Sequence, residues 1–109
     1  MASPVRWLEY DRTGNEVYLS QERWEHIIAP ENHPEMADFE DQLRETIRQG
    51  RRKQDTLNPR KYVYSATFNG LAEDNTHIVA IVLFRFREDE TRQPVPNNFV
   101  VTAYQKEIG

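Results

Sequence analysis

The chain has 109 residues, of which 38% are hydrophobic and 29% are charged. This length supports one hydrophobic core, so we expect a single domain over residues 1–109. Because the sequence contains no cysteine, disulfides, thiolate catalysis and cysteine-ligated zinc are excluded. No apolar run approaches the roughly 20 residues of a membrane span, and the N-terminal stretch MASPVRWLEY lacks the apolar core of a secretory signal. The sequence therefore predicts a cytoplasmic protein that does not enter a membrane.

The basic residues are distributed unevenly along the chain. The formal charge of the whole chain is −4, but residues 44–61 hold seven basic and two acidic side chains, a local charge of +5. Phosphate binding depends on Lys and Arg, so this segment is the predicted contact surface for RNA. A solvated loop after a helix whose dipole attracts arginines explains the same pattern, and the sequence does not separate the two. The residues that we expect to bind RNA are Arg48, Arg51, Arg52, Lys53 and Lys61.

The N-terminal part predicts a hairpin and then a short helix. Residues 5–10 and 16–19 are rich in aromatic and β-branched side chains and are separated by a polar stretch, which is typical of a β-hairpin. Ser20 is a suitable N-cap for a helix that ends at Ile28, because Pro30 cannot continue it.

Two of the three histidines flank the end of this predicted helix. Trp24 begins an apolar stripe, and His26 lies about 200° around the helix from it, so His26 should face solvent or a site. His33 stands directly before Pro34, whose ring disfavours helical backbone in the preceding residue, so His33 should lie in a loop.

A second helix is predicted from residue 35 to the vicinity of Gly50. Its apolar residues Met36, Phe39, Leu43 and Ile47 recur at the spacing of one buried helix face. Acidic residues crowd its start and arginines its end, and both placements favour the helix dipole.

Three strands are predicted in the second half of the chain. Residues 61–68 alternate in character, residues 78–84 are apolar on both faces as in a central strand, and residues 98–105 form the last strand. The acidic tract 88–90 and the prolines after it should form a turn. The expected fold class is therefore α+β, with an N-terminal hairpin, two helices, and an antiparallel sheet with the helices packed on one face.

The last predicted strand carries two hydroxyl groups on one face. Thr102 and Tyr104 alternate with Val101 and Ala103, and the face of Val101 and Ala103 is the better candidate for the core. Hydroxyls at this spacing can position a phosphate, although such a pair is also ordinary strand composition. The spacing of His26 and His33 matches no familiar metal site, and the chain lacks a glycine-rich phosphate loop, so we expect no metal and no cofactor.

Several short motifs together resemble a known family. RWEHI, HPEM, the strand RKYVY and the terminal FVVTAY are similar to those of phage-associated nuclease-like domains in the superfamily of barnase, EndoU, colicin and RelE-type ribonucleases. The resemblance covers residues 17–105 and implies helices, a four-stranded antiparallel sheet and metal-independent RNA cleavage. The residues that match the catalytic positions of that family are His26, His33, Arg60, Tyr64, Thr102 and Tyr104.

Two functions follow from these observations. The first is a metal-independent ribonuclease that cleaves RNA by histidine-based general acid and base chemistry. Such an enzyme can act as a toxin, and its partner would then be an antitoxin or other inhibitor protein. The second is a non-catalytic module on the same fold, with the basic segment as its contact surface for RNA or protein. A domain that only forms oligomers is a third and weaker interpretation.

Overall fold

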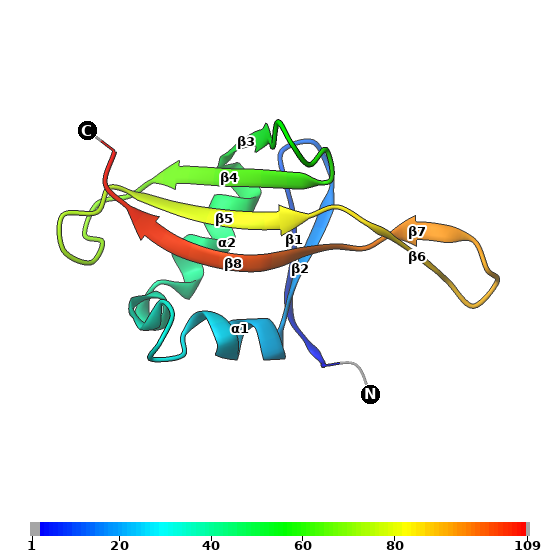
Figure 1. Ribbon diagram of the computed structural model, residues 1–109, viewed down its shortest axis with the longest axis horizontal. Helices are drawn as coiled ribbons and strands as arrows, with labels where there is room; N and C mark the ends of the chain where they lie inside the picture. Colours follow the sequence, from blue (N-terminus) through cyan, green and yellow to red (C-terminus); the bar gives the residue numbers. More distant parts are fainter. Residues whose placement is uncertain (1–2, 109) are drawn as a thin grey trace.

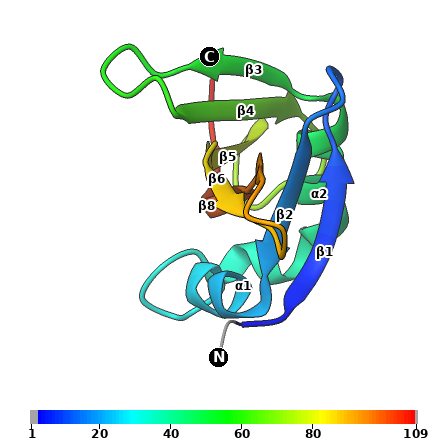
Figure 2. The same cartoon turned by 90° about the vertical axis from the view of Figure 1, so that its right-hand side faces the viewer.

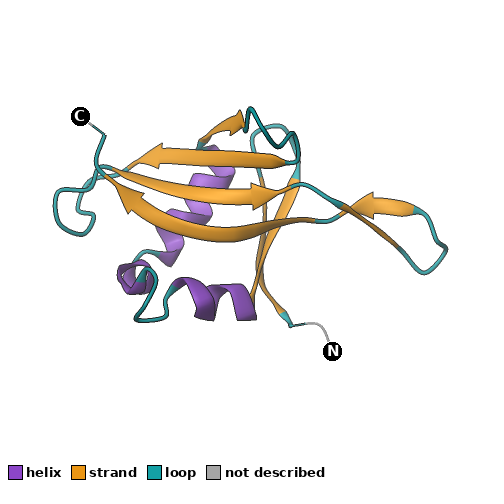
Figure 3. Ribbon diagram, viewed as in Figure 1, coloured by secondary structure: helices purple, strands orange, loops and turns teal. Residues whose placement is uncertain are grey.

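The computed structural model describes residues 3–108 (Figure 1). Two α-helices and a short 3-10 helix precede most of the strands, as Figure 3 shows by colour. The elements are β1 (Val5–Tyr10), β2 (Glu16–Ser20), α1 (Gln21–Ile27), η1 (Pro34–Asp38), α2 (Glu40–Gln49), β3 (Arg51–Gln54), β4 (Lys61–Thr67), β5 (His77–Leu83), β6 (Phe86–Glu88), β7 (Pro94–Pro96) and β8 (Asn98–Lys106). Within residues 3–108, no helix combines the length and the apolar character that crossing a membrane requires.

The main sheet has six strands in the order β1-β2-β8-β5-β4-β3, and β6 and β7 form a separate two-stranded arm. The α+β class and the N-terminal hairpin are therefore confirmed. The sheet is not wholly antiparallel, because β2 and β8 pair in parallel through Val17 with Asn98 and Tyr18 with Phe99. A parallel pair needs a long crossover connection, and all the helices and strands between residues 21 and 97 supply it.

The sheet curls around α2, so that its two edge strands approach each other. In Figure 2, β1 and β2 stand upright on one side while β3 and β4 cross the top, and α2 lies within this curve. Arg52 on β3 places Nη1 3.7 Å from Oδ2 of Asp11, which directly follows β1. The opposite face of β4, β5 and β8 points away from the helices (Figure 1).

The predicted second helix is divided in two. Pro34–Asp38 forms a 3-10 turn, Phe39 leaves helical geometry with φ −127° and ψ 28°, and the α-helix begins at Glu40. The prediction of one continuous helix was therefore wrong, although its apolar face is correct. Met36, Leu43 and Ile47 are fully buried, and Phe39 packs against the core from a partly buried position. These side chains join Ile78, Ala80 and Val82 of β5 in a single cluster.

The last strand changes its phase along its length. Thr102 pairs with Ile81 and Val100 pairs with Val82, so Val101 is an extra residue in a β-bulge. Val100 and Ala103 are both buried as a result. The expected inward face of Val101 and Ala103 is therefore half right, because the bulge exchanges the two faces between these residues.

Three strands were not expected from the sequence. Residues 51–54, interpreted as part of a polar connection, form β3 at the edge of the sheet, and the acidic turn with its prolines is the tip and side of the β6–β7 arm. β3 and β7 are short, mostly exposed strands with charged or proline residues, a composition that is common at sheet edges. Such strands show no alternation of apolar residues that the sequence analysis could detect.

Candidate functional site

Side chains from four adjacent strands share the sheet face that the helices leave open. The pairing places Arg51, Ser65, Val79 and Tyr104 in one row across β3, β4, β5 and β8. Because paired residues project to the same side of a sheet, each row is a line of neighbouring side chains about 5 Å apart. The other rows are Lys53, Val63, Ile81 and Thr102; Thr67, His77 and Lys106; and Lys61, Leu83 and Phe99. We call these four rows the open face.

The open face is basic although the protein is acidic. Its rows contain four Lys or Arg side chains and one histidine, and none of the paired positions is Asp or Glu. The middle of the face is well packed, since Val79 is only 4% exposed between its neighbours. A positively charged sheet face with an apolar floor suits an anionic partner with flat groups, such as single-stranded nucleic acid.

His33 lies at the β8 edge of this face. Its ring centre is 5.7 Å from that of Tyr104, and its Nδ1 is 3.6 Å from Oε1 of Glu35. Because β2 pairs only with the start of β8, the rest of that edge is free for α1 and η1 to pack against it. The backbone N–H of His33 donates to the Ile27 carbonyl at 2.8 Å, which fixes the loop to the end of α1. The structure thus brings together His33, Tyr104 and, by register, Thr102.

His26 is exposed on α1, as its angular separation from Trp24 predicts. Its carbonyl accepts hydrogen bonds from the side-chain amide of Asn32 at 2.8 Å and from the backbone of Ala29 at 3.4 Å. The end of α1 that carries His26 is therefore tied to the loop that carries His33, but among the described residues only the His33 ring is paired with the ring of Tyr104 on β8.

The two residues expected from the RKYVY strand have different surroundings. Arg60 is exposed at the end of the β3–β4 loop. This loop extends to the upper left in Figure 2, whereas the α1–η1 loop extends to the lower left. Tyr64 is completely buried on the helix side of β4, and its hydroxyl donates to Asp11 at 2.6 Å. The structure does not bring Tyr64 to the open face, because alternate residues of a strand point to opposite sides.

The residues expected to bind RNA also divide by location. Arg51, Lys53 and Lys61 lie on the open face. Arg48 instead donates to Glu9 at 3.0 Å, on the helix side of β1. Arg52 stacks over the ring of Tyr62 at 4.6 Å, and this contact together with its approach to Asp11 makes it part of the packing between the sheet edges.

Comparison with protein-family models, curated proteins and solved structures gives no match for this chain. The site must therefore be judged from its own residues. Among the described residues, no group of three or more His, Cys, Asp or Glu side chains is placed to hold a metal ion.

Three residues at this site were missed by the sequence analysis. Glu35 was interpreted only as a favourable charge at a helix start, and Ser65 was placed on a strand without a role. His77 was considered only as a distant third ligand of a metal site that we do not expect. The alternation of β4 already put Ser65 on the side away from Tyr64. The pairing with β5, which depends on the register, is what adds His77 to the same face.

A buried carboxylate holds the curled sheet together. Asp11 is 8% exposed and accepts from the backbone and side chain of Thr13 and Asn15 as well as from Tyr64. Burial alone would raise the pKa of Asp11, but the hydrogen bonds from Tyr64, Asn15 and Thr13 outweigh it and hold the pKa below its usual value. The same burial and the Asp11 carboxylate raise the pKa of the Tyr64 hydroxyl. Both groups are therefore structural in this conformation.

We expect Asp11→Asn to lower the free energy of unfolding at neutral pH by about 1–3 kcal/mol, because a buried hydrogen-bond partner is lost. A depressed folded-state pKa contributes stability above the unfolded value near 3.9, and this contribution disappears as the pH falls through the folded-state pKa. The variant should therefore lose less stability than the wild type on acidification below about pH 4. Urea titrations at several pH values measure this.

Asp89 provides a matched control. In the β6–β7 turn it accepts from Thr91 and Gln93 as Asp11 does from Thr13 and Asn15, but its side chain is only partly buried. Asp89→Asn should have a smaller effect, because no buried tyrosine depends on it. Equal effects of the two substitutions would contradict the buried link.

Proposed function

We propose that the protein binds single-stranded RNA on the open face and cleaves it without a metal ion. The observation that carries the proposal is the shared face of Arg51, Lys53, Thr102 and Tyr104, with the ring of His33 stacked at its edge. These groups supply phosphate-binding cations, hydroxyl donors and an imidazole able to move protons near neutral pH.

The chemistry assigned to these residues is transfer of the phosphate to the 2′-oxygen. His33 removes the proton from the 2′-hydroxyl, and that oxygen forms a bond to phosphorus. The bond from phosphorus to the 5′-oxygen breaks, and the leaving oxygen takes a proton from the Tyr104 hydroxyl. The proton held by His33 then returns to Tyr104, whose ring lies beside it. The products are a 2′,3′-cyclic phosphate and a 5′-hydroxyl.

Two further groups have supporting roles in this proposal. The carboxylate of Glu35 lies 3.6 Å from Nδ1 of His33 and orients the ring, which leaves Nε2 to exchange protons with the substrate. Thr102 lies two residues before Tyr104 on the same face and donates to the phosphate oxygens, on which negative charge develops in the transition state. Arg60 precedes Lys61 at the other end of β4, away from the row of Tyr104, and has no role in this step. His26, near the end of α1 and joined through its carbonyl to Asn32 of the following loop, is the second imidazole that this proposal considers.

The proposal predicts that purified protein cleaves unstructured RNA in the presence of EDTA and leaves 2′,3′-cyclic phosphate ends. Mass spectrometry of the products identifies these ends. Loss of cleavage in EDTA would overturn the metal-free mechanism. Salt-dependent RNA binding without any cleavage would instead support the alternative of a binding module on the same fold.

Variants of the basic residues test the location of the RNA. Arg51→Ala and Lys53→Ala should each weaken RNA binding and lower the slope of log affinity against log salt by roughly 0.7, the value for one phosphate contact with a single strand. Arg87→Ala removes an exposed arginine from the β6–β7 arm and should leave both quantities unchanged. Equal effects of all three substitutions would mean that only the total charge matters.

A further inference from the structure

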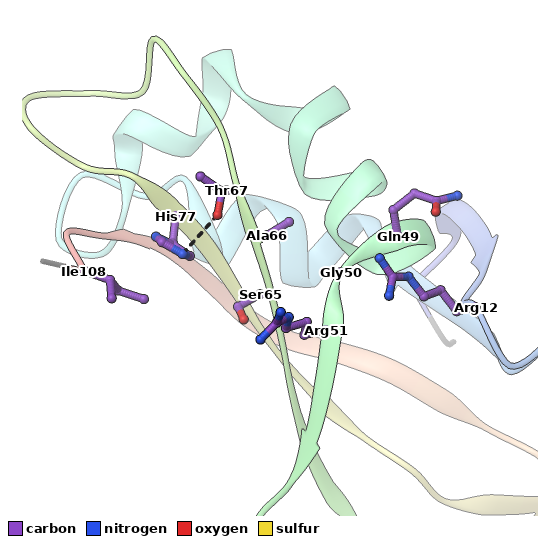
Figure 4. Close-up of a pocket in the computed structure, with 9 residues that line it drawn as sticks. All are labelled: Arg12, Gln49, Gly50, Arg51, Ser65, Ala66, Thr67, His77 and Ile108. Atoms are coloured by element: carbon purple, nitrogen blue, oxygen red, sulfur yellow. Dashed lines mark hydrogen bonds between the residues drawn. The ribbon is translucent and has the colours of Figure 1, made fainter.

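A polar hollow lies where the open face meets the C-terminal end of α2. Its volume is about 470 Å³. Figure 4 shows the residues that line it, which come from the β1–β2 turn, the end of α2, three strands and the C-terminal segment, with Arg12 on the opposite side of the view from Thr67 and His77. The lining residues are Arg12, Gln49, Gly50, Arg51, Ser65, Ala66, Thr67, His77 and Ile108.

The hollow exists because the sheet loses a strand at this point. β3 begins at Arg51, paired with Ser65, whereas β4 continues past it to Thr67. Gly50 allows the chain to leave α2 and enter β3 directly, because a Cβ there would lie 2.3 Å from the Thr46 carbonyl oxygen and 2.8 Å from that of Ser65. This close approach of the backbone places Arg51, the first residue of β3, at the edge of the hollow.

The lining has the composition of an anion site. Arg12 and Arg51 contribute two guanidinium groups, and Ser65 and Thr67 contribute hydroxyls. The nine described lining residues include no Asp or Glu, although acidic side chains outnumber basic ones in the chain by 18 to 14. The two guanidinium groups and the hydroxyls can neutralise and hydrogen-bond an anion.

His77 is held in a fixed orientation at the inner end of the hollow. Its Nε2 is 3.1 Å from the Thr67 hydroxyl and its Nδ1 is 2.7 Å from the Thr76 hydroxyl. When both ring nitrogens carry protons, both donate to these oxygens, and the Thr67 O–H is then released to donate elsewhere. The Thr67 hydroxyl and the two arginines line the same hollow and are the donors that it offers to an anion.

We propose that this hollow binds the phosphate group of a phosphate monoester. A phosphate dianion matches two guanidinium forks and a hydroxyl donor better than a carboxylate does, because its oxygens accept in several directions. The volume of the hollow far exceeds that of one phosphate. The remaining space admits the organic group to which the phosphate is esterified. The ligand can be a free nucleotide or the terminal phosphate of an RNA strand, and inorganic phosphate contains the part that both share.

Inorganic phosphate and adenosine 5′-monophosphate should bind the whole protein, while adenosine without the phosphate should not. Two-dimensional NMR at constant ionic strength should show shifts of the backbone amides of Gly50, Arg51 and Thr67. Arg51→Ala should weaken the affinity for both phosphates roughly 10- to 100-fold, as the loss of one charge-assisted interaction predicts. Arg12→Ala, in the exposed turn, should give the same direction of change and reports the second guanidinium.

Arg87→Ala is the control, since it removes the same charge from the β6–β7 arm. Absence of amide shifts at the hollow, or equal weakening by Arg87→Ala, would overturn the proposal. RNA oligonucleotides with and without a 5′-phosphate distinguish the two sources of the ligand: tighter binding of the phosphorylated strand assigns it to RNA, and no difference assigns it to a free nucleotide. None of these measurements uses cleavage, so the hollow and the nuclease proposal can fail separately.

Discussion

Replacing His33 with alanine should lower the rate of RNA cleavage by roughly 10²- to 10⁴-fold and leave the unfolding temperature nearly unchanged. The large effect is expected because the imidazole performs proton transfer in the bond-making step. The small effect on stability is expected because the side chain is 38% exposed and the loop is fixed by backbone hydrogen bonds that alanine retains. Single-turnover cleavage rates and thermal unfolding of both proteins measure the two quantities.

His26→Ala distinguishes the one-imidazole mechanism from a mechanism with two. If Tyr104 is the acid, Tyr104→Phe should reduce the rate strongly and His26→Ala only weakly. If His26 is the acid, the order is reversed. A His33→Ala protein that cleaves RNA at the wild-type rate would contradict the assignment of His33 altogether, and a variant that fails to fold would mean that the stacking on Tyr104 is structural.

Much of the fold follows from periodicity in the sequence. The hairpin, the capped helix at Ser20 and the central apolar strand are set by local patterns, and the structure confirms each of them; the Ser20 hydroxyl, for example, accepts from the Arg23 amide at 3.1 Å. The break at Phe39 could not be predicted, because the apolar spacing stays in phase across it. The edge strand β3 is equally invisible, since its stability comes from pairing with β4.

The candidate site was predictable residue by residue but not as an arrangement. Strand alternation alone places Thr102 and Tyr104 together and separates Ser65 from Tyr64. Which strands lie beside them depends on a strand order and a bulge that connect residues far apart in the chain. For the same reason a basic segment in sequence became two groups in space, one on the open face and one joined to Glu9 and Asp11.

The division of the arginines has a physical consequence for function. Arg44 and Arg48 approach Glu9 at 2.6 and 3.0 Å, so the Glu9 carboxylate offsets one of their two positive charges. Arg51 and Lys53 have no such acidic neighbour among the paired positions of the open face. In the proposed function, the positive charges of the open face attract the RNA to the side of the sheet that carries the hydroxyls.

The position of α2 inside the curled sheet is tested by Leu43→Ala, which should lower the free energy of unfolding by roughly 2–5 kcal/mol. Leu43 is fully buried and belongs to the cluster formed with β5, so truncation removes apolar contacts and leaves a cavity. Against a typical total of about 5–15 kcal/mol, such a loss is large, and the melting temperature should fall by several degrees or more. Urea denaturation and calorimetry measure it.

Leu57 provides a matched control for Leu43, because it is also a leucine but is 93% exposed in the β3–β4 loop. Leu57→Ala removes the same atoms from solvent rather than from the core, so it should change stability by less than about 0.5 kcal/mol. The contrast between the two substitutions isolates burial from composition. If Leu43→Ala proves as harmless as Leu57→Ala, α2 does not pack against the sheet, and the curvature that separates the open face from the helices has no support.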